Sequence, residues 1–363
     1  MVKMKHIISG AILAMMLTAC TDDGEEQSNE SENENLDDNE GEEEEQELSK
    51  LPLKENDNEF VSAADLVDTF DGSYSYDELH RTLEVSIMDE TYKMIYDVPV
   101  LEHNGEYIAN EEVKFEVEDE DVYLSLEFLN EGLGLAYEAD DDEVRFSPTE
   151  KSTPAYGEPA DFTFEEEEWD AEQMSEYLAF LQSPIEGAEV STVESHLPGA
   201  PRDYRNGEHE GIDWYEYGTE VEITTDTEIY GMADGTVVRA DHDYEEYSSP
   251  EERDEDLALA ADADETPEYI LDRLRGKQVW VQYENGVMNR FAHLHDIPDD
   301  IQVGDTIDEE TVIGYVGNSG TSHAVKGDEM GGLHLHQDLL IYGDLFYEPL
   351  NEEEVIDVLQ QIF

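Results

Sequence analysis

Two short histidine motifs most constrain how this chain folds: His-Glu-Gly-Ile-Asp at 209–213 and His-Leu-His at 334–336. Side chains two or four residues apart point to the same face of a β-strand. We therefore expect His209, Gly211 and Asp213 to share one strand face, where Gly211 leaves room between the other two side chains. The two histidines of the second motif should share a face of another strand. The spacing predicts two strands that bring their polar side chains to one site.

The residue types in these motifs suit one zinc ion. A catalytic zinc site usually has three protein ligands and an open position for water. We expect His209, Asp213 and His336 to be the three ligands. His334, together with His293 in a separate Phe-Ala-His-Leu motif, would then be free to handle protons. The alternative is that these histidines are exposed or core residues with no shared role.

The same motifs resemble those of the lysostaphin-type zinc endopeptidases, the LytM-like family of bacterial cell-wall hydrolases. The first motif is similar to the family's H-x-G-[IV]-D motif, and the second is similar to its closing H-x-H motif. The order and spacing of the similar segments extend over about 183–350 and include these stretches: 207–213, 234–238, 292–294, 303–306, 312–320 and 334–336.

This resemblance implies an antiparallel β domain that binds one zinc ion and hydrolyses peptide bonds in peptidoglycan stem peptides or cross-bridges. It implies that His209, Asp213 and His336 are metal ligands and that His293 and His334 are the catalytic pair. The sequence has no HExxH motif to supply a glutamate base, so histidine would take that role. A catalytically inactive relative that binds cell wall or activates another hydrolase is the main alternative. A purely binding or structural lipoprotein is a third.

The sequence departs from the family pattern in three places. Leu333 stands where proline or threonine often precedes the closing motif, and Gln337 and Asp338 follow it where Phe and Glu are common. An insertion at about 243–275 separates two expected strands, and it should contain one helix with Thr266 as its N-cap. None of these departures removes an expected ligand, so they bear on substrate preference rather than on activity.

The N-terminus predicts secretion and lipid attachment. A short basic region precedes an apolar core at 7–17 that is too short to span a membrane as a mature helix. Leu-Thr-Ala-Cys at 17–20 then resembles a bacterial lipobox, and Cys20 is the single cysteine of the chain. We expect residues 1–20 to be a lipoprotein signal peptide, with a lipid on Cys20 that anchors the extracellular protein to the cell membrane. An ordinary secretory signal with a stray cysteine is the alternative.

The chain is strongly acidic, with 97 Asp and Glu residues against 18 Lys and Arg residues. Fifteen of the thirty residues in 21–50 are acidic, so we expect a disordered tether over 21–57. Residues 51–363 still carry a formal charge near −67, which destabilises a folded domain unless salt screens it. This composition is typical of an extracellular protein from a salty environment. It excludes nucleic acid as a partner, because phosphates would be repelled.

Residues 58–148 are expected to form a small α+β repeat domain. Two similar segments each predict a short helix, a turn and two short strands, with the helices at 60–67 and 122–129. The pattern resembles the stalk repeats described as copper amine oxidase N-terminal-like. It contains no His/Cys cluster, so we infer a spacer or wall-contact role without copper.

The remaining chain divides into a joining segment and a C-terminal domain. We expect a linker and a helix over 149–182, then the zinc peptidase domain over 183–363, closed by a helix that Asn351 caps. The expected fold class is mainly β. It comprises a C-terminal antiparallel β-sheet metallopeptidase domain with a helical insertion, preceded by the α+β repeat domain and the disordered tether. The expected partners are peptidoglycan peptides and, through the lipid anchor, the membrane.

Overall fold

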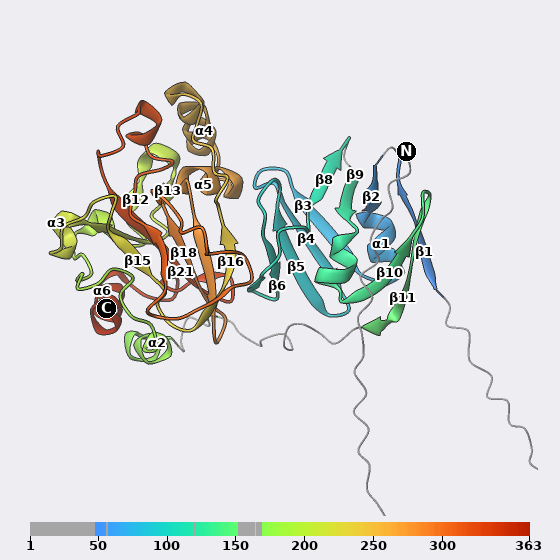
Figure 1. Cartoon of the computed structure of the whole chain (residues 1–363), viewed down its shortest axis with the longest axis horizontal. Coiled ribbons are helices and arrows are strands. Elements are labelled where there is room, and N and C mark those ends of the chain that lie inside the picture. Colours follow the sequence, from blue (N-terminus) through green and yellow to red (C-terminus); the bar gives the residue numbers. More distant parts are fainter. Residues whose placement is uncertain (1–47, 56, 120, 152–163, 165–168) are drawn as a thin grey trace, which may run out of the picture. The chain divides into compact units, whose positions relative to one another are not determined.

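The computed structural model describes residues 48–55, 57–119, 121–151, 164 and 169–363 (Figure 1). The sheets that the described residues form are antiparallel, so the expected mainly β class is confirmed. No helix in the described part of the chain is long and apolar enough to cross a membrane. The predicted signal peptide with Cys20, and the tether as far as residue 47, lie outside the described residues.

The N-terminal part contains two sheets and its own hydrophobic core. One sheet has the strand order β10-β11-β1-β2-β9-β8, and the other runs in sequence order from β3 to β7 (Figure 1). Tyr92, Phe128 and Phe146 are among the side chains that this core buries. The strands are β1 (Ser49–Lys54), β2 (Asp57–Ser62), β3 (Ser73–Asp77), β4 (Thr82–Ile87), β5 (Glu90–Ile95), β6 (Leu101–His103), β7 (Glu106–Ile108), β8 (Phe115–Glu118), β9 (Asp121–Ser125), β10 (Leu135–Ala139) and β11 (Glu143–Lys151).

The predicted repeat has shorter helical segments than expected. Helix α1 covers Ala63–Thr69, and the residues before it belong to strand β2. In the second copy, the expected helix at 122–129 is wrong. Residues 122–125 lie in β9, and helical structure is confined to the π-helix η1 (Phe128–Gly132). The Val-Tyr-Leu sequence at 122–124 favours a strand, and β9 pairs with both β2 and β8.

Ordered structure begins earlier than the predicted tether allows. Ser49–Lys54, which falls in the segment expected to be disordered, forms β1 and pairs with β11 and β2. Leu51 is buried there. Its apolar contacts offset part of the entropy cost of ordering this stretch.

The C-terminal part is built on a seven-stranded sheet with the order β14-β21-β18-β17-β16-β19, in which β22 also pairs with β21. Strands β18 (Val287–Ala292) and β21 (His334–Ile341) are buried along their whole length. The other strands of this sheet are β14 (Ile212–Tyr215), β16 (Gly235–Ala240), β17 (Val279–Tyr283), β19 (Thr306–Ile307) and β22 (Asp344–Leu345). Two short pairs lie outside it: β12 (Pro201–Arg202) with β13 (Gly207–Glu208), and β15 (Glu228–Tyr230) with β20 (Val312–Tyr315).

Two helices pack against each other and against the core of this part: α2 (Ala171–Leu178) and α6 (Glu352–Ile362). The side chain of Asn351 caps α6, as the sequence predicts, by accepting two backbone N–H groups of the first turn. The helix expected in the joining segment is present as α2, and the residues that precede it are partly outside the described ones. The remaining short helices are α3 (Glu216–Thr219), η2 (Glu194–His196), η3 (Asp203–Arg205) and η4 (Ala324–Lys326).

The insertion at 243–275 contains two helices rather than the single one expected. Helix α4 covers Pro250–Asp262, and α5 covers Glu268–Arg275. The predicted N-cap of α5 is wrong, because the following proline takes that position and makes no side-chain cap. Instead, the Thr266 hydroxyl donates to the carbonyl of Arg205 and accepts a bond from its guanidinium. Thr266 therefore links the insertion to the loop before the first histidine motif.

Candidate metal centre

Strand pairing gathers the histidine motifs at one end of the C-terminal sheet. Strand β21 lies between β14 and β18. Asp213 of β14 is opposite His336 of β21, and His336 is also opposite Ala292, the last residue of β18. His293 follows directly along the chain. Asp213 and His336 are 123 positions apart in sequence. They meet because the pairing of β14 with β21 places them opposite each other.

His209 reaches the site by a different route from the one expected. The chain leaves β13 at Glu208 and enters β14 at Ile212, so the first motif does not form a continuous strand face. A Cβ atom on Gly211 would lie 2.1 Å from the carbonyl oxygen of Gln337. Gly211 is therefore required for the close approach of this loop to β21, and not for room between two ligands.

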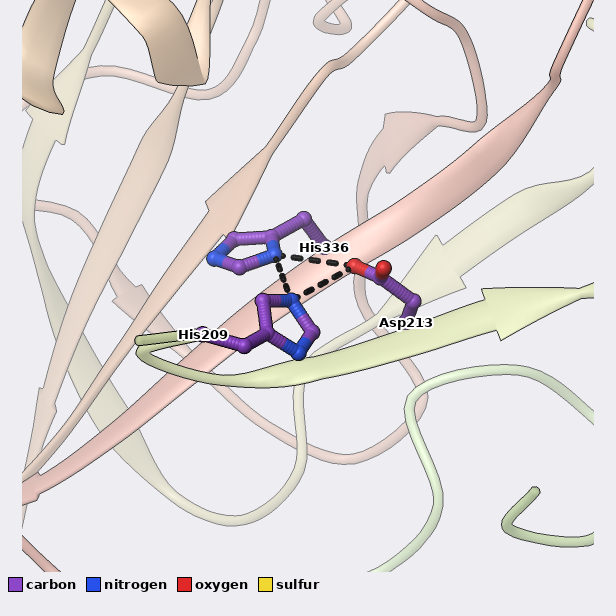
Figure 2. Close-up of side chains that lie close together, drawn as sticks. All are labelled: His209, Asp213 and His336. Atoms are coloured by element: carbon purple, nitrogen blue, oxygen red, sulfur yellow. Dashed lines mark hydrogen bonds and ion pairs between the residues drawn. The ribbon is translucent and has the colours of Figure 1, made fainter. Parts of the chain in front are cut away.

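Three buried ligand atoms form a nearly equilateral triangle (Figure 2). His209 Nε2 lies 3.1 Å from Asp213 Oδ1 and 3.1 Å from His336 Nδ1, and the latter two atoms are 3.0 Å apart. A zinc ion bound at about 2.0–2.1 Å in tetrahedral geometry separates its ligand atoms by about 3.3 Å. The structure thus brings the three predicted ligands together at distances that fit one zinc ion.

Hydrogen-bond acceptors fix which ring nitrogen of each histidine faces the triangle. His209 Nδ1 donates to the carbonyl of Leu197 at 2.9 Å, and His336 Nε2 donates to Asp338 Oδ1 at 2.6 Å. Because the donating nitrogen carries the proton of a neutral ring, the opposite nitrogen carries a lone pair. When both rings are neutral, two such lone pairs and the Asp213 carboxylate converge in the triangle, an arrangement that a bound cation stabilises.

The charges around the triangle also favour a cation. Burial would raise the pKa of Asp213, but the adjacent His209 and His334 hold that pKa well below its usual range. Burial would lower the pKa of His336, but Asp338 and Asp213 outweigh it and raise this pKa to about 9, so a metal ion that binds here displaces a proton from Nδ1. The same carboxylates would stabilise a metal ion at this position.

His293 and His334 lie beside the triangle. Their ring centroids are 4.7 Å apart, and each ring donates its Nδ1 proton to a carbonyl: His293 to Ser319 at 2.7 Å, and His334 to Gly332 at 2.8 Å. Each Nε2 is therefore left with a lone pair. Burial lowers the pKa of both rings, and for His293 well below the usual value. Both rings are neutral at neutral pH and can accept a proton.

Neighbouring groups hold these two rings in place. Tyr215 stacks on His334 with a centroid distance of 4.2 Å and an interplanar angle of 11°. His293 has a φ of +60°, in the left-handed region that is unfavourable for a side chain of this size. Its backbone N–H donates to the carbonyl of Arg275 at 2.8 Å, and this bond together with the one to Ser319 maintains the strained conformation.

Asp338 also belongs to the site, although in the sequence it stood out only as a departure from the family pattern. It is fully buried, and it accepts one bond from His336 and another from Arg275 Nε at 2.8 Å. Its position two residues after His336, on the same strand face, is the signal that would have identified it.

Replacing Asp338 with asparagine is expected to weaken zinc binding by about 10- to 100-fold. The amide has nearly the same shape, but it lacks the charge that holds the His336 ring and pairs with Arg275. Competition for zinc with a chromophoric chelator measures the change. The control is Asp344→Asn on strand β22, which should leave the affinity unchanged. Equal zinc affinities for both variants and the parent would contradict the role of Asp338.

A cleft of about 660 Å³ opens over the triangle. His293 and His334 line it, so their free nitrogens have access to a bound substrate. Both helices of the insertion line the cleft, through Leu257 of α4 and Leu271 and Leu274 of α5. A volume of this size is typical of a ligand site, and the insertion therefore helps to shape what enters it.

The N-terminal part matches a known family. Residues 41–147 match the family described as copper amine oxidase N-terminal domain. The resemblance predicted for the repeat segment is therefore confirmed. No curated protein sequence matches the chain.

Solved structures similar to the chain include peptidases. The catalytic domain of lysostaphin from Staphylococcus simulans has 16% identity and a TM-score of 0.23, over 46% of this chain and 86% of that one. A putative peptidase M23 from Pseudomonas aeruginosa has 19% identity and a TM-score of 0.28, over 69% and 84%. A structure of the SpoIIQ-SpoIIIAH pore-forming complex has 16% identity and a TM-score of 0.26, over 46% and 87%.

Proposed function

We propose that this chain is a zinc metalloendopeptidase that hydrolyses peptide bonds in peptidoglycan stem peptides or cross-bridges. The main support is the triangle of His209, Asp213 and His336, whose dimensions fit zinc, beside two neutral histidines. A catalytic zinc needs three ligands and an open side, and the cleft provides that opening. The choice of peptidoglycan as substrate rests on the resemblance of the motifs.

The residues of the chain would supply proton transfer and orientation. When bound, zinc supplies Lewis acidity, which polarises a carbonyl and makes water more acidic. One of the two neutral rings, His293 or His334, accepts the proton of the attacking water at Nε2 and can then donate it to the leaving amine. The other accepts a hydrogen bond from the attacking water at its Nε2 lone pair and so orients that water. The bonds from Nδ1 to backbone carbonyls keep both Nε2 atoms directed at the cleft.

Mass spectrometry of muropeptides released from purified cell wall tests this proposal. Protein loaded with zinc should release fragments with new amino termini at peptide bonds, and protein stripped of metal should release none. The assay needs molar salt, because the acidic chain repels itself in dilute buffer. Absence of new termini with the zinc-loaded protein, or the same fragments from the stripped protein, would contradict the proposal.

A catalytically inactive relative that binds cell wall or activates another hydrolase is the second candidate. Such a role does not require a complete set of ligands and catalytic side chains. In this chain the three proposed ligands and the two proposed catalytic histidines all lie together. Binding to purified wall without fragment release, together with stimulation of an added hydrolase, would support the second candidate over the first.

We also propose that a lipid on Cys20 anchors the protein to the outer face of the cell membrane. Replacing Cys20 with serine is expected to move the protein into the soluble extracellular fraction, because serine does not accept the lipid. Fractionation followed by immunoblotting measures this. The control is Thr21→Ser, which should stay with the membrane. A Cys20→Ser protein that remains on the membrane after a salt wash would contradict the anchor.

A further inference from the structure

The cleft over the metal centre carries a different charge from the rest of the chain. The whole chain has 97 acidic residues against 18 Lys and Arg residues. The residues that line the cleft include four arginines and two acidic residues. The arginines are Arg202, Arg205, Arg253 and Arg275, and the acidic residues are Glu210 and Asp213. The cleft, where a substrate would bind, therefore has more positive than negative side chains, although the chain as a whole is acidic.

Two of these arginines are neutralised by partners within the fold. Arg205 is buried and donates to Glu210 Oε2 at 2.7 Å. Arg275 is also buried, and its Nε donates to Asp338. Both guanidinium groups thus serve the structure of the site. Arg202 and Arg253 remain as candidates for contact with a ligand.

Arg202 reaches the cleft on the side of the Asp213 carboxylate. Its Nη2 donates to the carbonyl of Ser195 at 2.9 Å and lies 3.6 Å from Asp213 Oδ2. The side chain remains 14% exposed. In a loaded site the Asp213 charge would be shared with the metal, so Arg202 keeps donors available for a second anion.

Arg253 reaches the cleft on the side of His293. It stands on α4 of the insertion, and its Nε donates to the carbonyl of Gly320 at 2.9 Å. The residue before that glycine, Ser319, accepts the bond from His293, so Arg253 is fixed to the loop that orients this ring. Among the described residues, Arg253 forms no ion pair, and its hydrogen bond uses Nε alone. Both terminal nitrogens of the guanidinium are available.

We propose that Arg202 and Arg253 bind carboxylate groups of the substrate peptide on the two sides of the reacting bond. The guanidinium fork matches a carboxylate with two parallel N–H bonds. The leucines of α4 and α5 that line the same cleft limit the access of water and strengthen this attraction. An acidic peptide, which the surface charge of the chain would otherwise repel, is thereby accepted at the cleft. The inference deepens the proposed endopeptidase function and depends on it for the nature of the peptide.

Paired probes test the inference. Two synthetic cross-linked stem peptides are used, which are identical except that one has free carboxylates and the other has them amidated. Dissociation constants by calorimetry and kcat/KM by chromatography are measured for the parent protein, for Arg253→Gln, and for the control Lys326→Gln. The control removes a nearby positive charge that does not line the cleft. All measurements share one salt concentration, because screening weakens the attraction.

The parent protein and Lys326→Gln should bind the peptide with free carboxylates more tightly than the amidated peptide. In Arg253→Gln the ratio of these two affinities should be about tenfold smaller. Arg202→Gln should lose preference as well, with its zinc content measured in parallel because it contacts Asp213. Equal affinity of the parent for the two probes, or an unchanged preference in Arg253→Gln, would overturn the inference even if cleavage occurs. The parent protein could instead bind the free carboxylates and lose this binding in Arg253→Gln, yet cleave neither peptide. That result would support this site and contradict the endopeptidase proposal.

Discussion

Replacing His334 or His293 with alanine is expected to lower kcat/KM for wall peptides by about 10²- to 10⁴-fold, while the protein keeps most of its zinc. The two rings lie beside the ligand triangle, and their Nδ1 protons are already committed to backbone carbonyls. Their loss therefore removes proton transfer without removing a ligand. Peptide cleavage followed by chromatography, and zinc content by elemental analysis, measure the two effects on the same samples.

A nearby histidine provides the control for these variants. His295 is exposed, stands two residues after His293 and does not line the cleft. His295→Ala should cleave at the parent rate. Parent rates for both His293→Ala and His334→Ala would contradict the proposed chemistry. Loss of zinc from His334→Ala, with retention by His336→Ala, would show that the roles of these two residues are reversed.

Replacing His209 or Asp213 with alanine is expected to reduce bound zinc from about one ion per molecule to nearly none. Each variant leaves two of the three converging donors, and the Asp213 variant also removes the negative charge that attracts the metal. Cleavage should fall with the zinc content. Elemental analysis after dialysis measures the metal.

The control for the ligand variants is Asp203→Asn, which changes an exposed carboxylate in η3. It should retain the full zinc content of the parent. Full zinc content in both His209→Ala and Asp213→Ala would contradict the ligand assignment, whatever happens to cleavage.

The period-two pattern of a β-strand correctly predicted the site residues that lie on a regular strand. His334 and His336 do share a face of β21, as their spacing predicts, and both approach Asp213. The same rule failed for His209, because the chain leaves the strand between β13 and β14. That break depends on how closely Gly211 approaches β21, and such a tertiary contact has no periodic pattern.

The insertion shows a second limit of sequence patterns. Helix α4 buries few residues, among them Asp256 and Ala260, so it has no apolar stripe by which to recognise it. Its start was marked only locally, by Ser249 followed by proline at the first position. Its contribution to the cleft through Arg253 depends on packing against a loop 67 positions away in sequence, which no local pattern encodes.

A zinc titration of metal-free protein, with cleavage of wall peptides as the readout, tests the proposed metal centre most directly. Activity should rise in proportion to added zinc and saturate at about one ion per molecule. His209→Ala should show no rise over the same range, because the triangle is incomplete. Full cleavage by the metal-free protein, or a fully zinc-loaded protein that cleaves no peptide bond, would contradict the account.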